Sequence, residues 1–328
     1  MSKVVRVYRH GGPEELRLED LEVGEPGPAE VRLKVEAIGL NRSEAAFRAG
    51  EYPVTPKFPT LIGYEGVGLI EALGPGVQGF ALGERLCVLP NFRLGEYGIY
   101  GERAIVPARS LLSPPPGLTT VESASIWMQY LTALAIIEIA RAAIGDYVII
   151  RAASSSVGLA AIQLANWAGA VPIAATRTSA KASTLQHHGA RHVIATDETD
   201  LVAEGQRITG GKGARIIFDP VGGPDIEKLA LAAAEEGIIF VYGGLSGKPT
   251  PYPHWPAALK GLSIRGWVAS SIWNRPKRFV RNRELILQGL AAGRLRPVIA
   301  KTFPLSQIVA AHRYLESNQQ VGKIVVTV

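Results

Sequence analysis

A serine-rich loop is the segment of this chain whose residues could bind phosphate. Residues 152–158 read Ala-Ala-Ser-Ser-Ser-Val-Gly; the apolar run Tyr147–Arg151 precedes them, and a helical pattern over 159–168 follows. The next apolar run is Val171–Ala175, so strand, loop, helix and strand fall within about thirty residues, the setting of a dinucleotide-binding fingerprint. The N-terminus of such a helix offers backbone N–H groups and a favourable dipole to a pyrophosphate. The sequence predicts phosphate contacts mainly from the backbone amides of Ser154, Ser155, Ser156 and Val157.

The loop departs from the usual G-x-G-x-x-G pattern. Its three glycine positions hold Ala153, Ser155 and Gly158. Gly158 remains where helix and strand must pack closely, because a side chain there would hold them apart. Ser155 lies where the backbone comes nearest the pyrophosphate, and its small hydroxyl can itself donate a hydrogen bond. Whether the three serine hydroxyls strengthen or weaken phosphate binding is left open by the sequence.

The residues after the next strand favour NADP(H) over NAD(H). NAD-binding proteins place an Asp or Glu about twenty residues past the loop, on the ribose 2′-hydroxyl. Arg177 stands there instead, within a segment of two cations and three hydroxyls, and an arginine can bind phosphate through two donors at once. The alternative is a solvent-exposed turn with a Ser or Thr helix cap. The residues assigned to the 2′-phosphate are Arg177, Thr178, Ser179 and Lys181.

Further cofactor contacts are expected at the carboxyl ends of two later strands, where ligands bind in open parallel sheets. Those residues are Val221, Gly243, Gly244 and Leu245. The segment 243–248 is similar to a P-loop but lacks its first glycine, because Tyr242 stands there.

Composition is that of an ordinary globular enzyme. Of the 328 residues, 47% are hydrophobic and 20% charged, and Lys plus Arg exceed Asp plus Glu by 35 − 29 = 6. This excess suits anionic ligands, and without an interleaved aromatic and basic motif it does not indicate nucleic acid. The single cysteine, Cys87, excludes intramolecular disulfides and a cysteine-rich zinc lobe. No signal-peptide core or membrane-spanning segment is found, so we expect a cytoplasmic protein.

The order of elements predicts an α/β fold with two domains. Residues 1–118 contain short alternating strands between Gly and Pro signals, typical of a β-rich, partly barrel-like domain. Residues 119–269 alternate helix and strand, which predicts a doubly wound parallel sheet of six strands. From residue 270 a helix and two strands follow, and the last, 321–328, is expected to rejoin the first domain.

This arrangement resembles the medium-chain dehydrogenase/reductase superfamily, specifically its zinc-independent quinone oxidoreductase-like branch. The resemblance covers nearly the whole chain and rests on Gly39–Asn41, Gly63–Val77, Leu131–Leu134, Ser156–Leu159, Phe218–Gly223 and Gly322–Val326. It implies a GroES-like catalytic domain, 1–118 with 270–328, around a Rossmann domain, 119–269. It also implies NADPH-dependent reduction of a quinone or an α,β-unsaturated carbonyl, and a homodimer formed through the strand near 262–268.

The resemblance also bears on metal and catalysis. Asn41 and Tyr64 stand where zinc-dependent members carry Cys and His, and an amide and a phenol are poor zinc ligands; no metal is expected. Without a Lewis acid, conjugated substrates are easier to reduce than simple ketones, because hydride addition leaves a delocalised enolate. Asn41 is expected to orient substrate or cofactor, Tyr52 or Tyr64 to donate to the carbonyl oxygen, and Thr132 to contact the nicotinamide ribose or ring. The alternatives are a turn cap for Asn41, packing for the tyrosines, and a bond from Thr132 to its own helix.

Two questions of function stay open at this level. The basic run Arg275, Lys277, Arg278, Arg281 and Arg283 either receives an anionic handle, such as coenzyme A or a carrier-protein phosphate, or is the solvated face of a helix. The competing functions are an alcohol or ketone dehydrogenase of the same superfamily and a catalytically weak NADPH-binding protein, including an RNA-binding one.

Overall fold

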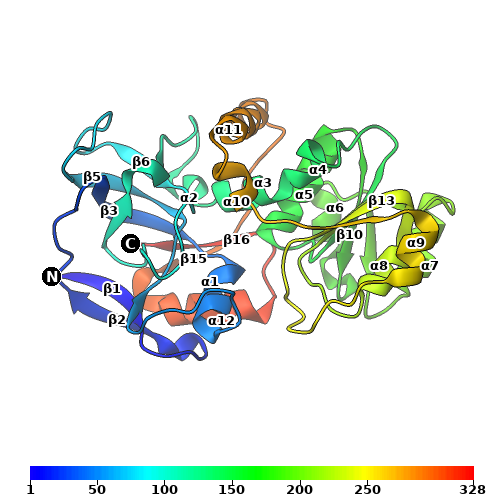
Figure 1. Ribbon diagram of the computed structural model, residues 1–328, viewed down its shortest axis with the longest axis horizontal. Helices are drawn as coiled ribbons and strands as arrows, with labels where there is room; N and C mark the ends of the chain where they lie inside the picture. Colours follow the sequence, from blue (N-terminus) through cyan, green and yellow to red (C-terminus); the bar gives the residue numbers. More distant parts are fainter. The chain divides into compact units, whose positions relative to one another are not determined.

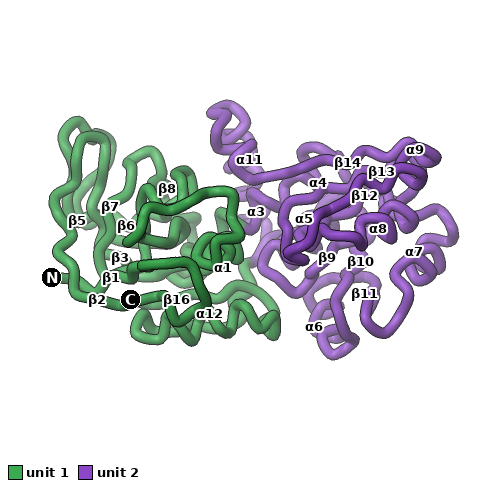
Figure 2. The backbone as a smooth tube through the Cα atoms, turned by 60° about the horizontal axis from the view of Figure 1, so that its bottom comes forward, with its two compact units in different colours: residues 1–128, 297–328 green, residues 129–296 purple.

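The computed structural model describes all 328 residues (Figure 1). They form two compact units, 1–128 with 297–328 (unit 1) and 129–296 (unit 2), coloured separately in Figure 2. Both chain ends therefore belong to unit 1, and unit 2 lies between them in sequence. Residues 270–296, assigned to the catalytic domain from the sequence, pack with unit 2.

Unit 1 is built around β3, Glu30–Gly39, whose residues alternate between buried and more exposed positions. This strand pairs antiparallel with β5 (Gly66–Leu73), β7 (Arg103–Pro107) and β16 (Lys323–Thr327). Val326 lies opposite Ile38, so the last strand joins the first domain, as the sequence predicts. The remaining strands of unit 1 are β1 (Ser2–Val7), β2 (Leu16–Leu21), β4 (Thr60–Leu61), β6 (Arg85–Val88), β8 (Leu111–Leu112) and β15 (Ile299–Pro304).

The strands of unit 1 form two sheets. One has seven strands in the order β15-β16-β3-β5-β6-β8 with β7 on β3, and the other has the order β2-β1-β4. Both contribute aliphatic side chains to one core. Helix α1 (Arg42–Ala49) lies beside α12 (Ile308–Ser317), as Figure 1 shows, and α2 spans Thr120–Ser123.

Unit 2 contains the predicted six-stranded parallel sheet, in the order β11-β10-β9-β12-β13-β14. Isoleucines lie opposite one another across five of its strands and form part of a buried apolar layer: Ile173, Ile149, Ile217, Ile239 and Ile264. The strand order reverses between β9 and β12, the switch point where such sheets bind ligands. The strands are β9 (Tyr147–Arg151), β10 (Val171–Thr176), β11 (His192–Ala195), β12 (Ala214–Asp219), β13 (Ala233–Val241) and β14 (Ser263–Gly266).

The helices of unit 2 differ from the predicted bounds at several ends. Helix α7 begins at Leu201, because the Asp200 side chain accepts the Ala203 N–H at 2.7 Å and caps it there. Helix α8 ends at Ala232, since β13 starts earlier than predicted; the pairing of β12 and β13 shifts register, and Glu236 adopts a positive φ of 55°. The other helices are α3 (Trp127–Ala133), α4 (Ala135–Glu138), α5 (Ser156–Trp167), α6 (Ala182–His187), α9 (His254–Lys260), α10 (Ser270–Trp273) and α11 (Pro276–Ala291). None of the helices in the chain has the length and apolar character needed to cross a bilayer.

Candidate functional site

The serine-rich loop connects β9 to α5, as predicted. Ser155 is the N-cap of α5, and its Oγ accepts the Gly158 N–H at 3.0 Å. The hydroxyl fixes where the helix begins and still has its own proton to donate. The N–H groups of Ser156 and Val157 lie in the first turn of α5, where no helical carbonyl can accept from them. They are thus available to a phosphate. The Ser155 N–H, which the sequence also assigned to phosphate, instead donates to the Ala152 carbonyl at 2.9 Å.

Two small residues explain how the loop turns so sharply. A Cβ added to Gly158 would lie 2.6 Å from the Ala153 carbonyl oxygen and 2.7 Å from its Cα, which confirms that this glycine is required for close packing. The residue with left-handed backbone is Ala152, with φ of 48°. Glycine adopts that conformation without cost, whereas alanine does not. The fingerprint pattern did not identify Ala152, because it precedes the first glycine position.

A lysine from the segment after β10 forms a hydrogen bond with this loop. Lys181, in the short 3₁₀ turn after β10, donates from Nζ to Ser154 Oγ at 3.1 Å. Burial lowers the pKa of Lys181, and the nearby Arg177 guanidinium lowers it further. Thr178 and Ser179 are exposed beside them. The structure therefore gathers the cations and hydroxyls that the sequence assigned to a 2′-phosphate.

A carboxylate that sequence reasoning missed lies in the same place. The exposed Glu198, in the connection after β11, accepts the backbone N–H of Ser179 through Oε1 at 2.8 Å. One N–H expected to face the 2′-phosphate is thus engaged, and a negative charge stands next to it. Glu198 follows β11, one strand later than the position after β10 where NAD-binding proteins carry their ribose-binding acid and where this chain has Arg177.

The loops after β12 and β13 lie together. Asp219 ends β12, and its carboxylate accepts the N–H groups of Val221 at 2.8 Å and Gly222 at 3.0 Å. A Cβ on Gly243 would come within 2.5 Å of the Pro220 oxygen, which also accepts the Leu245 N–H at 3.0 Å. Gly244 has open space around it. Val221, Gly243 and Leu245 are thus brought to adjacent strand ends.

Arg151, the last residue of β9, contacts these strand ends, a contact that the sequence analysis did not predict. Its guanidinium is 3.4 Å from Asp219 and 3.0 Å from Asp225, and its side chain is largely buried.

Thr132 is buried in α3, and its carbonyl oxygen accepts the Trp267 indole N–H at 2.7 Å. That bond fixes the end of α3 against the segment after β14.

In unit 1, Asn41 has an unexpected set of partners. It occupies the N-cap position of α1, and its backbone N–H donates to Glu44 Oε2 at 2.7 Å. Its Oδ1 accepts from Lys323 Nζ at 2.7 Å, while Nδ2 donates to Gly39 O at 3.1 Å and Glu65 Oε2 at 3.2 Å. Both amide protons are used inside unit 1, which favours a positioning role over direct hydrogen bonding from Nδ2 to a substrate.

Lys323 and Glu65 form a buried ion pair of 2.7 Å, with side chains 1% and 0% exposed. Glu65 also accepts the Met128 N–H at 2.8 Å. Because these residues are 258 positions apart, nothing in the local sequence pattern points to their pairing.

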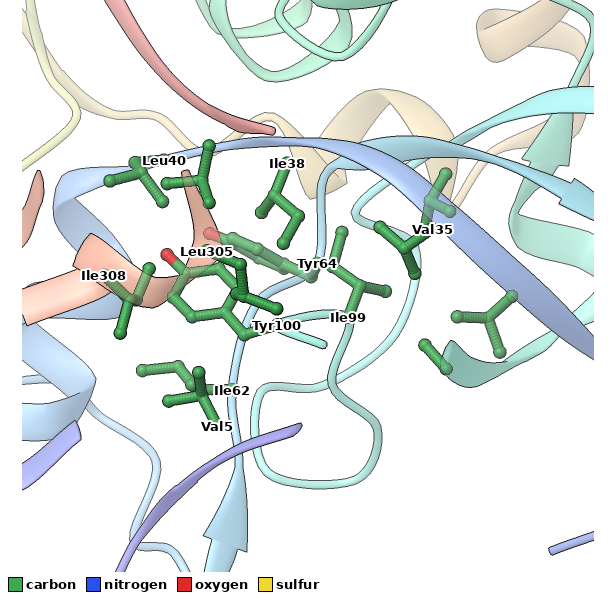
Figure 3. Packing of buried hydrophobic residues seen from close by; sticks show 14 of the residues in the cluster. Val5, Val35, Ile38, Leu40, Ile62, Tyr64, Ile99, Tyr100, Leu305 and Ile308 are labelled. Atoms are coloured by element: carbon green, nitrogen blue, oxygen red, sulfur yellow. The ribbon is translucent and has the colours of Figure 1, made fainter. Parts of the chain in front are cut away.

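The two candidate tyrosines differ in their hydroxyl partners. The Tyr64 hydroxyl is 2.5 Å from Ser43 Oγ, and the ring is packed among aliphatic side chains such as Ile38 and Ile99 (Figure 3). The half-buried Tyr52 makes no hydrogen bond through its hydroxyl. Burial raises the pKa of both phenols, that of Tyr64 well above its usual value. Each stays protonated near neutral pH and can act as a donor.

Glu44 holds two site residues through their backbones. This fully buried carboxylate accepts the N–H groups of Asn41 at 2.7 Å and Tyr64 at 3.2 Å, and the Tyr100 hydroxyl at 2.6 Å. Burial raises the pKa of Glu44 to about 7, against the lowering effect of those hydrogen bonds. An Asn followed three residues later by a Glu is a capping-box pattern, so the sequence did contain a signal for this residue.

These donors do not suit a zinc ion. The Asn41 amide oxygen is bound to the Lys323 ammonium, and the Tyr64 phenol to Ser43. Amide and phenol are weak ligands compared with thiolate and imidazole, and a dication here would lie close to a buried ammonium. No group of three or more His, Cys, Asp or Glu side chains in the chain is arranged to hold a metal.

Comparison with known proteins agrees with this architecture. Residues 27–116 match the family described as alcohol dehydrogenase GroES-like domain, and residues 156–284 match the one described as zinc-binding dehydrogenase. A 2-haloacrylate reductase from a Burkholderia species is 32% identical over 97% of both chains.

Two solved structures cover the whole chain and are themselves fully covered. An NAD-dependent alcohol dehydrogenase is 31% identical with a TM-score of 0.86, and an Escherichia coli quinone oxidoreductase complexed with NADPH is 26% identical with a TM-score of 0.91. From these matches and the two folded units, the chain belongs to the medium-chain dehydrogenase/reductase superfamily, in its quinone oxidoreductase-like branch.

Proposed function

We propose that this protein is an NADPH-dependent oxidoreductase that reduces a quinone or the C=C bond of an α,β-unsaturated carbonyl by hydride transfer. The observation that carries the proposal is the bond from Lys181 to Ser154, with Arg177 close enough to lower the lysine pKa. Two cations beside a phosphate-binding loop suit a 2′-phosphate. The 2-haloacrylate reductase and the NADPH-bound quinone oxidoreductase among its relatives support the substrate class and the cofactor.

Unit 2 supplies the cofactor site in this proposal. The first-turn amides of α5, at Ser156 and Val157, and the loop at Ser154 and Ser155 receive the pyrophosphate. The 2′-phosphate is surrounded by Arg177, Thr178, Ser179 and Lys181. Ser179 contributes its hydroxyl to this site, because its backbone N–H already donates to Glu198. Thr132, Val221, Gly243, Gly244 and Leu245 are assigned to the nicotinamide half. NADPH, when bound, supplies the hydride.

Unit 1 supplies the proton donors. Hydride addition to a conjugated carbonyl places negative charge on its oxygen, which a neutral phenol can stabilise by hydrogen bonding. Tyr52 has an unengaged hydroxyl for this purpose, whereas Tyr64 shares a short hydrogen bond with Ser43. We assign Tyr52 to the substrate oxygen, and the Tyr64–Ser43 pair to proton transfer from solvent. Asn41, bound by Lys323 and Glu65, keeps the α1 end in place.

We further propose that the reaction needs no zinc. The support is the donor set at Asn41 and Tyr64, which a buried ammonium and a serine already engage. An alcohol dehydrogenase remains the second candidate because of the 31% identity to an NAD-dependent one.

The experiment is a rate survey at 340 nm with NADPH. The acceptors are 2-haloacrylates, simple enones and small quinones, and the same survey runs alcohols with NADP+, with and without a zinc chelator. Turnover of at least one conjugated acceptor, unchanged by the chelator, is expected. Turnover confined to alcohols, or lost on chelation, would contradict the proposal; tight NADPH binding without any turnover would favour a binding protein.

We also propose a homodimer through β14. This strand is the edge of the six-stranded sheet, most of its residues are exposed, and Val268 just beyond it is 59% exposed. An unpaired edge strand can extend the sheet with its twin. Light scattering should give twice the 35.0 kDa chain mass, and a monomer mass at micromolar concentration would refute it.

A further inference from the structure

An open cleft in unit 2 shares no residue with the cofactor and substrate sites assigned above, and one of its residues, Arg265, lies in β14, the strand proposed to form the dimer. Its volume is about 530 Å³, and it is lined by Glu138, Arg265, Arg275, Lys277, Arg278 and Arg281. These residues come from α4, β14 and the start of α11. Five cations surround one carboxylate, so the lining carries 5 − 1 = +4, against +6 for the whole chain. We call it the basic cleft.

Glu138 fixes two of the cations. Its nearly buried carboxylate accepts two bonds of 2.7 Å from Arg278 and one of 2.7 Å from Arg281. Arg278 also donates to Ser271 O at 3.0 Å, and its guanidinium lies 5.4 Å from the centre of the Trp267 ring. Arg278 is therefore held in place before any ligand binds, which reduces the entropy lost on binding.

The other three cations have no such partners. Arg265, Arg275 and Lys277 are exposed, and their side chains form no ion pair or hydrogen bond. Arg275 is the N-cap of α11, Lys277 lies in its first turn, and no acidic residue is present there. A helix N-terminus carries partial positive charge and favours Asp or Glu. Cations at this end repel both one another and the helix dipole, and a local conflict of this kind is expected where function requires it.

We propose that the basic cleft binds a small molecule carrying two or more phosphate groups. Guanidinium groups bind phosphate oxygens in pairs, and four arginines line this cleft, with Arg278 already oriented. The volume is within the range of about 300–1,000 Å³ typical of small-molecule sites. The lining is charged instead of apolar, so recognition depends on the ligand's charge. The site goes beyond the proposed function and does not depend on it.

The test is calorimetric titration of the full chain with inorganic tripolyphosphate at constant ionic strength. Arg265→Ser/Arg275→Ser/Lys277→Ser removes the three unpaired cations of the cleft. Arg93→Ser/Lys212→Ser/Arg313→Ser is the matched control, since these three are exposed and form no ion pair either. We expect the tightest tripolyphosphate site to be the basic cleft, with affinity at least about tenfold weaker in the cleft variant and unchanged in the control.

A third variant, Arg177→Ser/Lys181→Ser, separates this site from the cofactor site, because it should leave tripolyphosphate binding in the basic cleft intact. Urea midpoints check folding, and the cleft variant should be at least as stable as the unmodified chain, because like charges have been removed. No binding by the unmodified chain, equal binding by the cleft variant, or loss only in the Arg177/Lys181 variant would overturn the proposal. So would binding restricted to RNA or to anionic vesicles.

Discussion

Replacing Lys323 with methionine should destabilise unit 1 strongly. The ammonium is 1% exposed and lies 2.7 Å from both Glu65 Oε2 and Asn41 Oδ1. Removing it leaves the Glu65 carboxylate buried with only the Met128 N–H at 2.8 Å and the Asn41 amide at 3.2 Å. Breaking a buried pair by deleting one partner costs about 3–5 kcal/mol, a large share of the roughly 5–15 kcal/mol that stabilises a domain.

The assay is urea unfolding followed by far-ultraviolet circular dichroism at neutral pH. Lys3→Met is the matched control, because Lys3 also lies 2.7 Å from a carboxylate, Asp20, but with side chains 46% and 53% exposed. An exposed pair of this kind contributes less than about 1 kcal/mol. The double variant Lys323→Met/Glu65→Gln should recover most of the loss, because glutamine keeps a hydrogen-bond acceptor without the buried charge. Equal, small effects from Lys323→Met and Lys3→Met would refute the reasoning.

Ala152→Gly should raise the free energy of unfolding by about 1 kcal/mol in thermal or urea denaturation, because glycine adopts the left-handed φ of 48° without steric strain. An unchanged free energy of unfolding would show that the alanine is not strained at this position. Glu198→Gln should lower the KM for NADPH several-fold and leave that for NADH unchanged or raised, since a carboxylate next to the 2′-phosphate region is removed; a rise in the NADPH KM would contradict that placement. Tyr52→Phe should reduce kcat about 100-fold or more with little effect on NADPH binding, and Tyr64→Phe should reduce it less; the reverse order in steady-state rates would exchange their roles. Burial raises the pKa of Glu44 from the usual 4.5 to about 7, so as pH rises the unfolded chain loses this proton before the folded chain does, and the free energy of unfolding falls by about 3 kcal/mol between pH 4.5 and 7. Glu44→Gln should remove this pH dependence from the urea midpoints. The same pH dependence in both proteins would show that the Glu44 carboxyl does not titrate in this range.

Local patterns in the sequence were sufficient for the cofactor-binding unit. A strand, loop and helix that interact are neighbours in sequence, so the β9–α5 connection and the need for Gly158 could be predicted from residue types alone. The six parallel strands followed from the alternation of helix and strand, whereas their order in the sheet is known only from the structure. Helix ends were less certain, because a cap such as Asp200 or a register shift near Glu236 decides them.

Long-range pairs could not be predicted in this way. Glu65 and Lys323 are 258 residues apart and meet only because β16 pairs with β3. Glu198 reaches Ser179 across two loops, and neither loop carries a pattern that fixes its path. The partners of the Asn41 amide could not be predicted for the same reason, since Glu65 and Lys323 come from distant segments.

The preference between NADPH and NADH tests the central claim most directly. Dissociation constants for both cofactors are measured by fluorescence titration of the unmodified chain and of Arg177→Ser/Lys181→Ser. Lys181 on Ser154, with Arg177 near that lysine, predicts that NADPH binds at least about tenfold more tightly than NADH and that the variant loses this preference. Equal affinities in the unmodified chain, or a preference that survives in the variant, would contradict the assignment of Arg177 and Lys181 to the 2′-phosphate.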